Sequence, residues 1–347
     1  MSKILILGGT GNISEPITRM LRNRGEEVIL FNRGTRKLFE DILTITGDRD
    51  SLEDKQRAAA SGPFDCVIDM IGFTPQHAYD DIAAFGGKTE QFIFCSTFNV
   101  FSQPVLGLPM SNEGERKPAK TFAYACDKAE MENIFRKAAE QDMFKLTIIR
   151  CSATYREDGL PLPIIGGHGN DGAMPTLSRI LRGKPLVVPG DGTSVWSVTY
   201  HDDVAGAFAG AVKNKKAYNQ SYTLCSDQSL TWEEYYRIAA KAWSAPEPDF
   251  IHVSSDLVYR CLPEKTFWLK EAFHYHCFFD TTKAKQDLGY QCTVSWEEGS
   301  RMQCIWHKKQ NDICMVDDPE YEFFVSSYLK LEQEMENLCR NFRNSLS

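Results

Sequence analysis

The chain has 347 residues, of which 42% are hydrophobic and 25% are charged, and its formal net charge is −8. This length and composition are typical of a globular protein with one large or two modest domains, and they exclude a chain that is disordered throughout. A net negative charge gives no long-range attraction for phosphate backbones, so a nucleic-acid partner is not expected.

The eleven cysteines stand singly, and no Cys-x-x-Cys pair occurs. An odd number with this spread favours reduced thiols in a cytoplasmic protein over a disulfide framework or a zinc ribbon. The apolar run at residues 3–7 is too short for a signal-peptide core or a membrane span. We therefore expect a cytoplasmic protein that does not enter a membrane.

Strands and helices alternate along the first part of the chain. Apolar runs predict strands at Lys3–Leu7, Glu27–Phe31, Leu43–Thr46, Cys66–Met70, Phe92–Cys95 and Leu146–Ile149. Helices are expected between them at Glu15–Arg24, Leu52–Ala60 and Lys128–Gln141. This alternation predicts an α/β fold, a Rossmann-type doubly wound parallel sheet with helices on both faces.

After Arg150 the strict alternation is lost. Residues 156–175 are rich in Gly and Pro and are expected to form loops. Further helices are predicted at Pro175–Leu181 and Asp202–Val212, and further strands at Leu186–Val188 and Ser221–Cys225. We expect residues 1–155 to form the sheet domain, with returning elements around 186–225, and residues 156–310 to form mainly a smaller lobe. An amphipathic pattern from Pro319 to Arg343 predicts a helical extension at 315–347 that packs on the body or on a second subunit, so a homo-oligomer stays open.

The stretch GGTGNIS, residues 8–14, joins the first strand to the first helix. In such a turn the first glycine permits the tight bend, and the second lets the backbone approach a pyrophosphate at the helix N-terminus. Gly8 and Gly11 fill these positions. Ser14 stands at the position of a third glycine, which would let the first helix pack closely on the first strand. A serine there loosens this helix–strand packing but keeps the phosphate-binding turn. A plain tight turn is the alternative for the loop taken alone.

The residues after the second and third strands bear on the choice of dinucleotide. NAD-binding proteins often carry an acid here for the ribose 2′-hydroxyl, whereas this chain has Asn32 and Arg33. An amide beside a guanidinium could accept a 2′-phosphate, so NADP stays open beside NAD. Asp48, after the third strand, could accept a hydrogen bond from the adenine amino group or cap the next helix.

Tyr124 and Lys128 are four residues apart, so they share a face if their segment is helical. A lysine near a phenol and a nicotinamide ribose can lower the tyrosine pKa, which lets the tyrosine remove a proton from a substrate hydroxyl while hydride leaves the same carbon. Thr97 ends the fifth strand and could hold the reacting oxygen opposite Tyr124. The alternatives are a solvated helix face for the pair and a loop start for the threonine.

These segments, in this order and spacing, resemble the extended short-chain dehydrogenase/reductase family, the group called NAD-dependent epimerases/dehydratases. The resemblance covers roughly residues 3–305 and is carried by GGTGNIS, GDRD, FIFCSTFNVF, YACDK and GDGTSVWSVTYHDDVAGAF. It implies a dinucleotide-binding Rossmann domain over 1–155, a substrate-binding lobe over 156–310, and Thr97, Tyr124 and Lys128 as the catalytic set. It implies NAD(P) as cofactor, with NAD slightly favoured, and contacts to it from Tyr124, Lys128 and a further set: Gly8, Thr10, Gly11, Asn12, Ile13, Asn32, Arg33, Asp48, Arg49, Met70, Ile71 and Gly72.

Within the family, the segments ILRGKPLVVPGDG, HDDVA and FDTTKAKQDLGY resemble the branch of chloroplast stem-loop-binding proteins, which act on RNA. Members of that branch have largely lost the tyrosine–lysine pair, whereas this chain keeps Tyr124 and Lys128. Retained chemistry is the simpler interpretation.

The chain departs from the pattern of sugar-nucleotide enzymes in the family. Those enzymes usually carry an Asn after the sixth strand and an Arg that pairs with a diphosphate, and the corresponding positions here hold Ala153 and Trp196. Loss of the guanidinium removes a diphosphate clamp, and Trp196 would bind substrate by ring stacking instead. A dehydratase usually has a carboxylate just after the catalytic threonine; Phe98 and Asn99 follow here, which disfavours that reaction.

We therefore expect an NAD(P)-dependent oxidoreductase or epimerase that acts on a secondary alcohol of a sugar or sugar-like substrate, with Thr97 and Trp196 contacting that substrate. The alternatives are an NADPH-dependent reductase of a small carbonyl compound and a non-catalytic RNA-binding or scaffold protein that kept the fold. No metal site is expected, because His274 and His276 have no evident third ligand. The substrate, the choice between NAD and NADP, the fate of the hydride and the oligomeric state stay open.

Overall fold

The computed structural model describes all residues except 37, 106, 163–164, 166–168 and 347, and in the first turn of one helix, at 169–171, it describes the backbone alone. The described residues divide into two compact units. The first unit comprises Met1–Arg156, Ser197–Ser229 and His276–Ser295, and the second comprises Glu157–Trp196, Leu230–Tyr275 and Trp296–Ser347. Each unit is described by itself.

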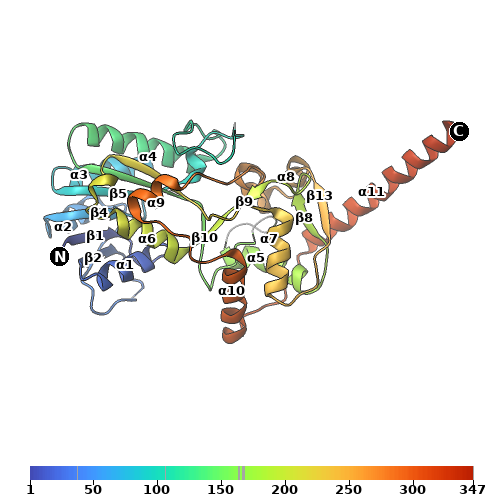
Figure 1. Ribbon diagram of the computed structural model, residues 1–347, viewed down its shortest axis with the longest axis horizontal. Coiled ribbons are helices and arrows are strands. Elements are labelled where there is room, and N and C mark those ends of the chain that lie inside the picture. The colour runs from blue at the N-terminus through green and yellow to red at the C-terminus, as the bar shows by residue number, and fades with distance from the viewer. Residues whose placement is uncertain (37, 106, 163–164, 166–168, 347) are drawn as a thin grey trace. The chain divides into compact units, whose positions relative to one another are not determined.

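The first unit is built on a parallel sheet of seven strands in the order β11-β6-β5-β4-β1-β2-β3. Their bounds are β1 Lys3–Leu7, β2 Glu27–Asn32, β3 Thr44–Thr46, β4 Phe64–Asp69, β5 Thr89–Thr97, β6 Lys145–Cys151 and β11 Gln220–Leu224. Figure 1 labels β5, β4, β1 and β2, which are neighbours in this order. The order reverses at β1, which has β2 on one side and β4 on the other. Ligands of such sheets bind outside the carboxyl ends of the strands at this reversal. The predicted α/β Rossmann-type fold is confirmed.

Helices cover both faces of the sheet because the strands are apolar on both sides. Ile4 and Ile6 pack toward α1 (Ser14–Asn23) and α6 (His201–Ala211). Leu5 and Leu7 point the opposite way, as alternate strand residues must, toward a second set of helices. That set is α2 Leu52–Ala59, α3 Pro75–Phe85 and α4 Ala123–Glu140.

The rest of the first unit consists of short elements. They are β7 Ala153–Tyr155, which pairs in parallel with β10 Val198–Tyr200, the helix α9 Thr282–Leu288, and the single turns η1 Phe98–Val100 and η2 Lys215–Ala217.

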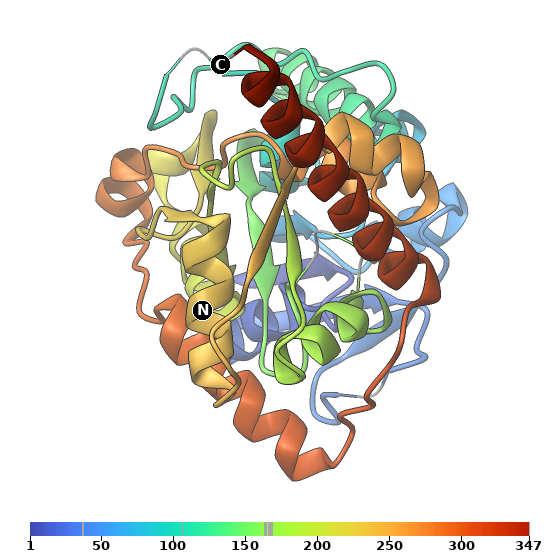
Figure 2. The same cartoon turned by 90° about the vertical axis from the view of Figure 1, so that its right-hand side faces the viewer.

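The second unit has two small strand pairs and a larger share of helix than the first. Figure 2 shows its last helix in dark red, ending at the C-terminus. The pairs are β8 (Leu186–Pro189) with β13 (Phe250–Val253) and β9 (Val195–Trp196) with β12 (Leu230–Thr231). The helices are α5 Gly169–Leu181, α7 Trp232–Ala242, α8 Ser255–Cys261, α10 Trp296–Gln310 and α11 Pro319–Leu346, with single turns η3 Pro263–Lys265 and η4 Leu269–Phe273. The strand expected at Leu186–Val188 forms, but it pairs with β13 and does not return to the large sheet.

Two helices differ in extent from the prediction. The helix expected from Lys128 begins earlier, at Ala123, so Tyr124 lies in its first turn. The helix expected from Pro175 begins at Gly169, with Pro175 inside it, whereas loops were expected up to that point. Pro175 lies beyond the first turn, so it removes one intrahelical hydrogen bond from α5, and the sequence rule that a proline starts a helix failed here.

The helix α7 was not predicted, although its start carries a sequence signal. The Thr231 hydroxyl accepts a hydrogen bond of 3.2 Å from the Glu234 N–H, and the Glu234 carboxylate accepts one of 2.9 Å from the Thr231 N–H. This reciprocal arrangement is a capping box, for which Thr-x-x-Glu before an apolar run is the signature.

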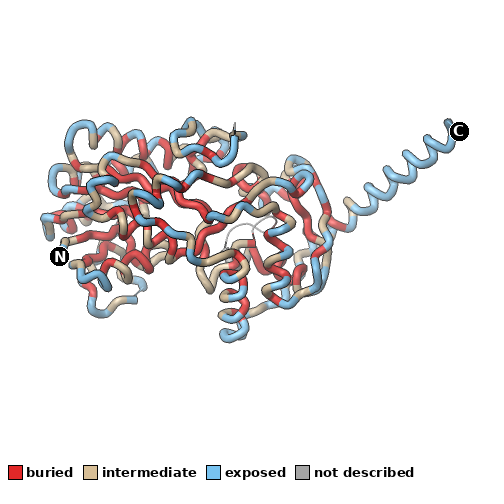
Figure 3. Tube along the Cα trace, viewed as in Figure 1, coloured by how far each residue is buried: buried red, intermediate tan, exposed pale blue. Residues whose placement is uncertain are grey.

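The helix α11 confirms the amphipathic pattern at the end of the chain. Only Tyr321, Phe324 and Val325, in its first two turns, are buried (Figure 3). No helix among the described residues combines the length and the apolar character that a membrane crossing needs.

Candidate active site

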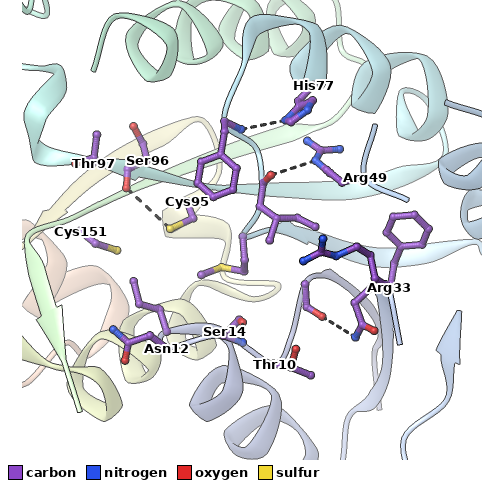
Figure 4. A pocket seen from close by; sticks show the side chains of 18 of the residues that line it. Thr10, Asn12, Ser14, Arg33, Arg49, His77, Cys95, Ser96, Thr97 and Cys151 are labelled. Carbon is purple, nitrogen blue, oxygen red and sulfur yellow. Dashed lines mark hydrogen bonds between the residues drawn. The ribbon is translucent and has the colours of Figure 1, made fainter. Parts of the chain in front are cut away.

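A pocket of about 730 Å³ lies along the carboxyl edge of the large sheet. Residues that follow β1, β2, β3, β4, β5 and β6 all contribute to its lining, and all of them belong to the first unit. Arg33 lies at one end of the pocket, and Thr97 and Cys151 lie at the opposite end, with Thr10 and Asn12 between (Figure 4). The pocket therefore has the position at which a doubly wound sheet binds a ligand.

The glycine turn after β1 is held tightly against β2. Gly8 and Gly9 have φ angles of +108° and +89°, a backbone region that side chains disfavour. A Cβ atom on Gly9 would lie 2.5 Å from a methyl carbon of Leu30. The Thr18 hydroxyl donates a hydrogen bond of 2.9 Å to the Gly9 carbonyl, which ties the turn to α1. The start of α1 therefore faces the pocket at a fixed position.

Ser14 does more than replace a glycine. Its hydroxyl accepts a hydrogen bond of 2.8 Å from the Gly11 N–H, and its side chain is buried. A Cβ atom on Gly11 would come within 3.3 Å of the same hydroxyl. Ser14 thus closes the turn from inside, a role that the sequence analysis missed.

The end of β2 combines a fixed amide with two uncovered guanidiniums. The Asn32 amide donates to the Gly8 carbonyl at 3.1 Å and accepts from the Gly34 N–H at 2.8 Å. Arg33 and Arg36 line the pocket and are exposed, and neither forms an ion pair with any residue that the structure describes. Asn32 therefore shapes the turn, while the two arginines leave a positive end to the pocket.

Arg49 lines the pocket, but its charge is neutralised by the protein itself. Its guanidinium bonds Asp69 at 3.1 Å and Asp81 at 2.7 Å, and both carboxylates are buried. Burial alone would lower the pKa of Arg49, but these carboxylates raise it above its ordinary value. Arg49 consequently connects β4 to α3 and is not a free cation for a phosphate.

Asp48 is exposed at the pocket edge. Its carboxylate accepts a hydrogen bond of 3.0 Å from the Asp50 N–H. Ser51, and not Asp48, caps α2, since its hydroxyl accepts from the Asp54 N–H at 3.1 Å. The capping alternative for Asp48 is therefore wrong, and its contact with adenine stays a prediction.

The edge of β4 contributes part of the pocket wall. Met70 and Ile71 line the pocket, whereas Gly72 does not. A Cβ atom on Gly72 would lie 2.2 Å from a buried carboxylate oxygen of Asp69, so the position requires glycine. His77, which the sequence analysis missed, lines the pocket and contacts Asp50 at 2.7 Å. No motif marks His77, because only the fold of α3 brings it to this edge.

Thr97, Tyr124 and Lys128 meet at the opposite end of the pocket. The Thr97 and Tyr124 side chains are hydrogen-bonded. Burial and the nearby Cys95 raise the pKa of the Tyr124 phenol by more than this hydrogen bond lowers it. The predicted lowering of the Tyr124 pKa is therefore not found in the protein without cofactor.

Lys128 is directed toward the strand beneath the pocket. Its ammonium donates a hydrogen bond of 2.7 Å to the Cys95 carbonyl and lies 4.8 Å from the centre of the Phe94 ring. Burial lowers the pKa of Lys128.

The remaining loop residues also line the pocket. Thr10, Asn12 and Ile13 do so, and the Asn12 amide donates a hydrogen bond of 2.9 Å to the Thr154 carbonyl. Two buried thiols, Cys95 and Cys151, complete the end of the pocket near Lys128, and they were not predicted there.

Trp196 is part of the core of the second unit. It is 1% exposed, and its ring stacks on Trp232 with centroids 5.0 Å apart and meets the edge of Phe273 at 4.9 Å. Its ring faces are therefore occupied by neighbours, which is a correction to the expectation that Trp196 stacks on a substrate. Among the described residues, no cluster of three or more His, Cys, Asp or Glu side chains could hold a metal ion.

A seven-stranded parallel sheet in this order, with a glycine turn and a pocket at its switch point, defines a Rossmann-type protein. The sequence profile of the NAD dependent epimerase/dehydratase family matches residues 4–225, and the chain belongs to this family.

Two relatives illustrate the range of the family. The chain is 27% identical over 316 residues to the chloroplast stem-loop binding protein of 41 kDa b of Arabidopsis thaliana, a match that covers 86% of this chain and 77% of that protein. It is 25% identical over 246 residues to 2′-dehydrokanamycin reductase of Streptomyces kanamyceticus, which covers 70% of this chain and 67% of that protein.

Solved structures confirm the fold. UDP-glucose 4-epimerase of Thermotoga maritima, solved with UDP-glucose, is similar with a TM-score of 0.70 and 20% identity over 89% of this chain and 100% of that one. UDP-glucose 4-epimerase of Bifidobacterium longum, in complex with NAD+ and UDP, is similar with a TM-score of 0.69 and 18% identity over 90% of this chain and 100% of that one.

Proposed function

We propose that this protein is an NAD(P)-dependent oxidoreductase or epimerase that interconverts a secondary alcohol and a ketone of a sugar or sugar-like substrate. The observation that carries the proposal is one pocket that joins the glycine turn to Tyr124, Lys128 and Thr97. These three side chains come from α4 and the end of β5 and lie where an α/β sheet of this type presents its chemistry. The bound dinucleotide would supply the acceptor or donor of hydride.

The residues present fit a dinucleotide. The start of α1 faces the pocket, and helix N-termini with close backbone approach favour pyrophosphate. Gly11 keeps the wall open there, because any Cβ would crowd the Ser14 hydroxyl at 3.3 Å. Gly8, Thr10, Gly11, Asn12 and Ile13 would hold the diphosphate, Asp48 the adenine, and Lys128 and Tyr124 the nicotinamide end.

The charge at the far end favours NADP(H) over NAD(H). Arg33 and Arg36 line the pocket without a carboxylate partner among the described residues, and no acid stands at the end of β2 for a ribose 2′-hydroxyl. An uncovered guanidinium binds phosphate oxygens strongly. We propose that Arg33 and Arg36 bind the 2′-phosphate.

Tyr124 would move the proton. Its raised phenol pKa keeps it protonated near neutral pH, so it can donate a proton to a carbonyl oxygen directly. Oxidation of an alcohol requires that proton to leave first. Thr97, which is hydrogen-bonded to Tyr124, would hold the same oxygen, and Lys128 would position the first turn of α4. A protonated phenol is the form that the NADPH-dependent reductase alternative requires, but an unshifted tyrosine is also protonated at neutral pH, so the turnover assay decides the direction.

The test has a binding step and a turnover step. Calorimetric titration with NADPH and with NADH should show binding, tighter for NADPH. The absorbance of reduced nicotinamide is then followed with a panel of keto sugars and small ketones, using the wild type and Tyr124→Phe. Failure of both dinucleotides to bind at millimolar concentration would end the proposal.

A second candidate rests on the match to the chloroplast stem-loop binding protein. In that case the chain would bind a stem-loop RNA, and the affinity would fall steeply with salt. Gel-shift titration with a stem-loop RNA at two salt concentrations distinguishes the candidates. Salt-sensitive binding that Tyr124→Phe leaves intact, together with no response to dinucleotide, favours this second function.

A further inference from the structure

The helix α11 presents an apolar stripe that no described part of the chain covers. Its members are 61–65% exposed and recur at three- and four-residue spacing: Leu331, Met335, Leu338 and Phe342. We call these four residues the α11 seam. The stripe starts at Phe324, which packs on the second unit, and continues past Tyr328, whose hydroxyl donates to the His252 carbonyl at 3.0 Å. Such spacing is that of a coiled-coil contact line.

This stripe belongs to a long, solvated helix. Every residue from 329 to 346 is exposed, which Figure 3 shows as an unbroken pale-blue segment at the end of the chain. A helix of this kind is marginal in water unless its apolar face is packed, since propensity alone contributes little. Exposed apolar side chains in a continuous row mark an interaction surface.

The charges on α11 indicate what packs there. The half that follows the body carries Lys330 together with Glu332, Glu334 and Glu336 and is net negative, whereas the last turns carry Arg340 and Arg343. Two such helices side by side in the same direction would align their carboxylates. In opposite directions, each acidic half would face a basic half. A negatively charged membrane surface would be repelled by the carboxylates.

We infer that the α11 seam binds the α11 seam of a second copy of this chain in antiparallel orientation. In one register, Leu331 lies opposite Phe342 of the second copy and Met335 opposite its Leu338, and the twofold axis repeats both contacts. Glu332 is then level with Asn341 of the second copy, and Arg343 of that copy lies two residues, about 3 Å, from this level on the same side of the seam, a distance that its long side chain spans to form an ion pair. This inference concerns the second unit and does not depend on the chemistry of the pocket.

The first experiment measures the mass of the full chain by sedimentation velocity over a range of concentrations. The wild type should sediment as a dimer. Leu338→Glu should raise the dimer dissociation constant by more than about tenfold, since it buries an unpaired charge. Gln333→Glu adds the same charge on the opposite side of the helix and should leave the dimer intact. Circular dichroism melting checks that both variants fold.

The second experiment tests the orientation. Glu332→Lys should weaken the dimer, because it places like charges together. The double variant Glu332→Lys with Arg343→Glu should restore the dimer, since the pair is then exchanged. A parallel arrangement gives no such restoration.

Three results would overturn the inference. They are a wild type that stays monomeric at every concentration, a dimer that Leu338→Glu leaves unchanged, and a monomer that cosediments with lipid vesicles through α11. A restored dimer in the double variant supports it directly.

Discussion

The ammonium of Lys128 donates a hydrogen bond of 2.7 Å to the main-chain carbonyl of Cys95. This bond connects the first turns of α4 to β5, two residues before Thr97. Tyr124 lies one turn earlier on the same helix, so the bond helps to hold the start of α4 against the end of β5, where Thr97 lies. Lys128 is therefore a positioning residue in the protein without cofactor.

Replacing Lys128 by methionine should cost stability. The change keeps the length of the side chain but leaves the Cys95 carbonyl without its donor, which costs about 1–3 kcal/mol in the free energy of unfolding. Urea denaturation measures it. Tyr124→Phe, which keeps the ring, serves as the comparison and should cost less. Equal losses in the two variants would remove the special role of Lys128.

Tyr124→Phe should abolish most turnover without weakening dinucleotide binding. Loss of a general acid lowers the rate by about 10²- to 10⁴-fold. The raised pKa predicts a second result for the protein without cofactor. The phenolate of Tyr124 is measured as the difference in absorbance near 295 nm between the wild type and Tyr124→Phe. This difference should develop only above the ordinary tyrosine pKa of about 10. A phenolate that forms below pH 9 contradicts this environment.

Arg33→Ser should reduce the preference for NADPH. Charge-assisted hydrogen bonds contribute about 1.5–3 kcal/mol, so the affinity for NADPH should fall by about 10- to 100-fold while that for NADH changes little. Titration of each variant with both dinucleotides measures the ratio. Arg22→Ser is the control, because Arg22 pairs with Asp41 and does not line the pocket. An equal loss for NADH and NADPH would assign Arg33 to a part of the cofactor that the two share.

Two glycines of the turn should behave differently. Gly9→Ala places a methyl group 2.5 Å from Leu30 at a φ of +89°, so unfolding should become easier by about 2–4 kcal/mol. Gly11→Ala has no such backbone strain and should cost less than about 1 kcal/mol. Its methyl group crowds Ser14 at the pocket, so dinucleotide affinity should fall instead. Thermal melts and calorimetry together separate the two effects.

Glu132 should account for part of the acid sensitivity. Burial alone would raise its pKa, but hydrogen bonds from Arg150 and Ser96 and the charge of Arg116 hold the pKa below its ordinary value. A carboxyl group whose pKa is lowered by folding stabilises the protein fully at pH values above its pKa in the unfolded chain. This stabilisation is lost as the pH falls through the lower pKa of the folded state. Glu132→Gln should therefore destabilise the protein by about 3–5 kcal/mol at neutral pH, because three arginines lose their carboxylate.

The difference between Glu132→Gln and the wild type should shrink as the pH falls below the ordinary glutamate pKa. Chemical denaturation across that range measures it. Glu130→Gln, on the exposed side of the same helix, is the matched control and should change neither the stability nor its pH dependence. A constant difference at every pH would show that Glu132 does not titrate in this way.

The sequence by itself determined which segments form the strands of the sheet but not where each strand ends, since β5 runs from Thr89 to Thr97 and was expected from Phe92 to Cys95. Runs such as Lys3–Leu7 and Phe92–Cys95 are apolar on both faces, and only a covered parallel sheet buries both, so these runs and the glycine turn predicted a Rossmann-type fold. The same reasoning brought Thr97, Tyr124 and the turn to one edge, because parallel strands end at the same edge.

Only the tertiary structure decided how individual side chains are used. The family resemblance implies a cofactor contact for Arg49, but α3 and β4 bring Asp81 and Asp69 to its guanidinium and neutralise its charge. Trp196 reads as a stacking surface, but Trp232 and Phe273 cover its ring. Lys128, on α4, donates a hydrogen bond to the main-chain carbonyl of Cys95 on β5. Each outcome depends on residues that are far away in the chain. Burial and ion pairing determine whether a side chain is exposed and charged, and both arise only when the folded chain brings those residues together.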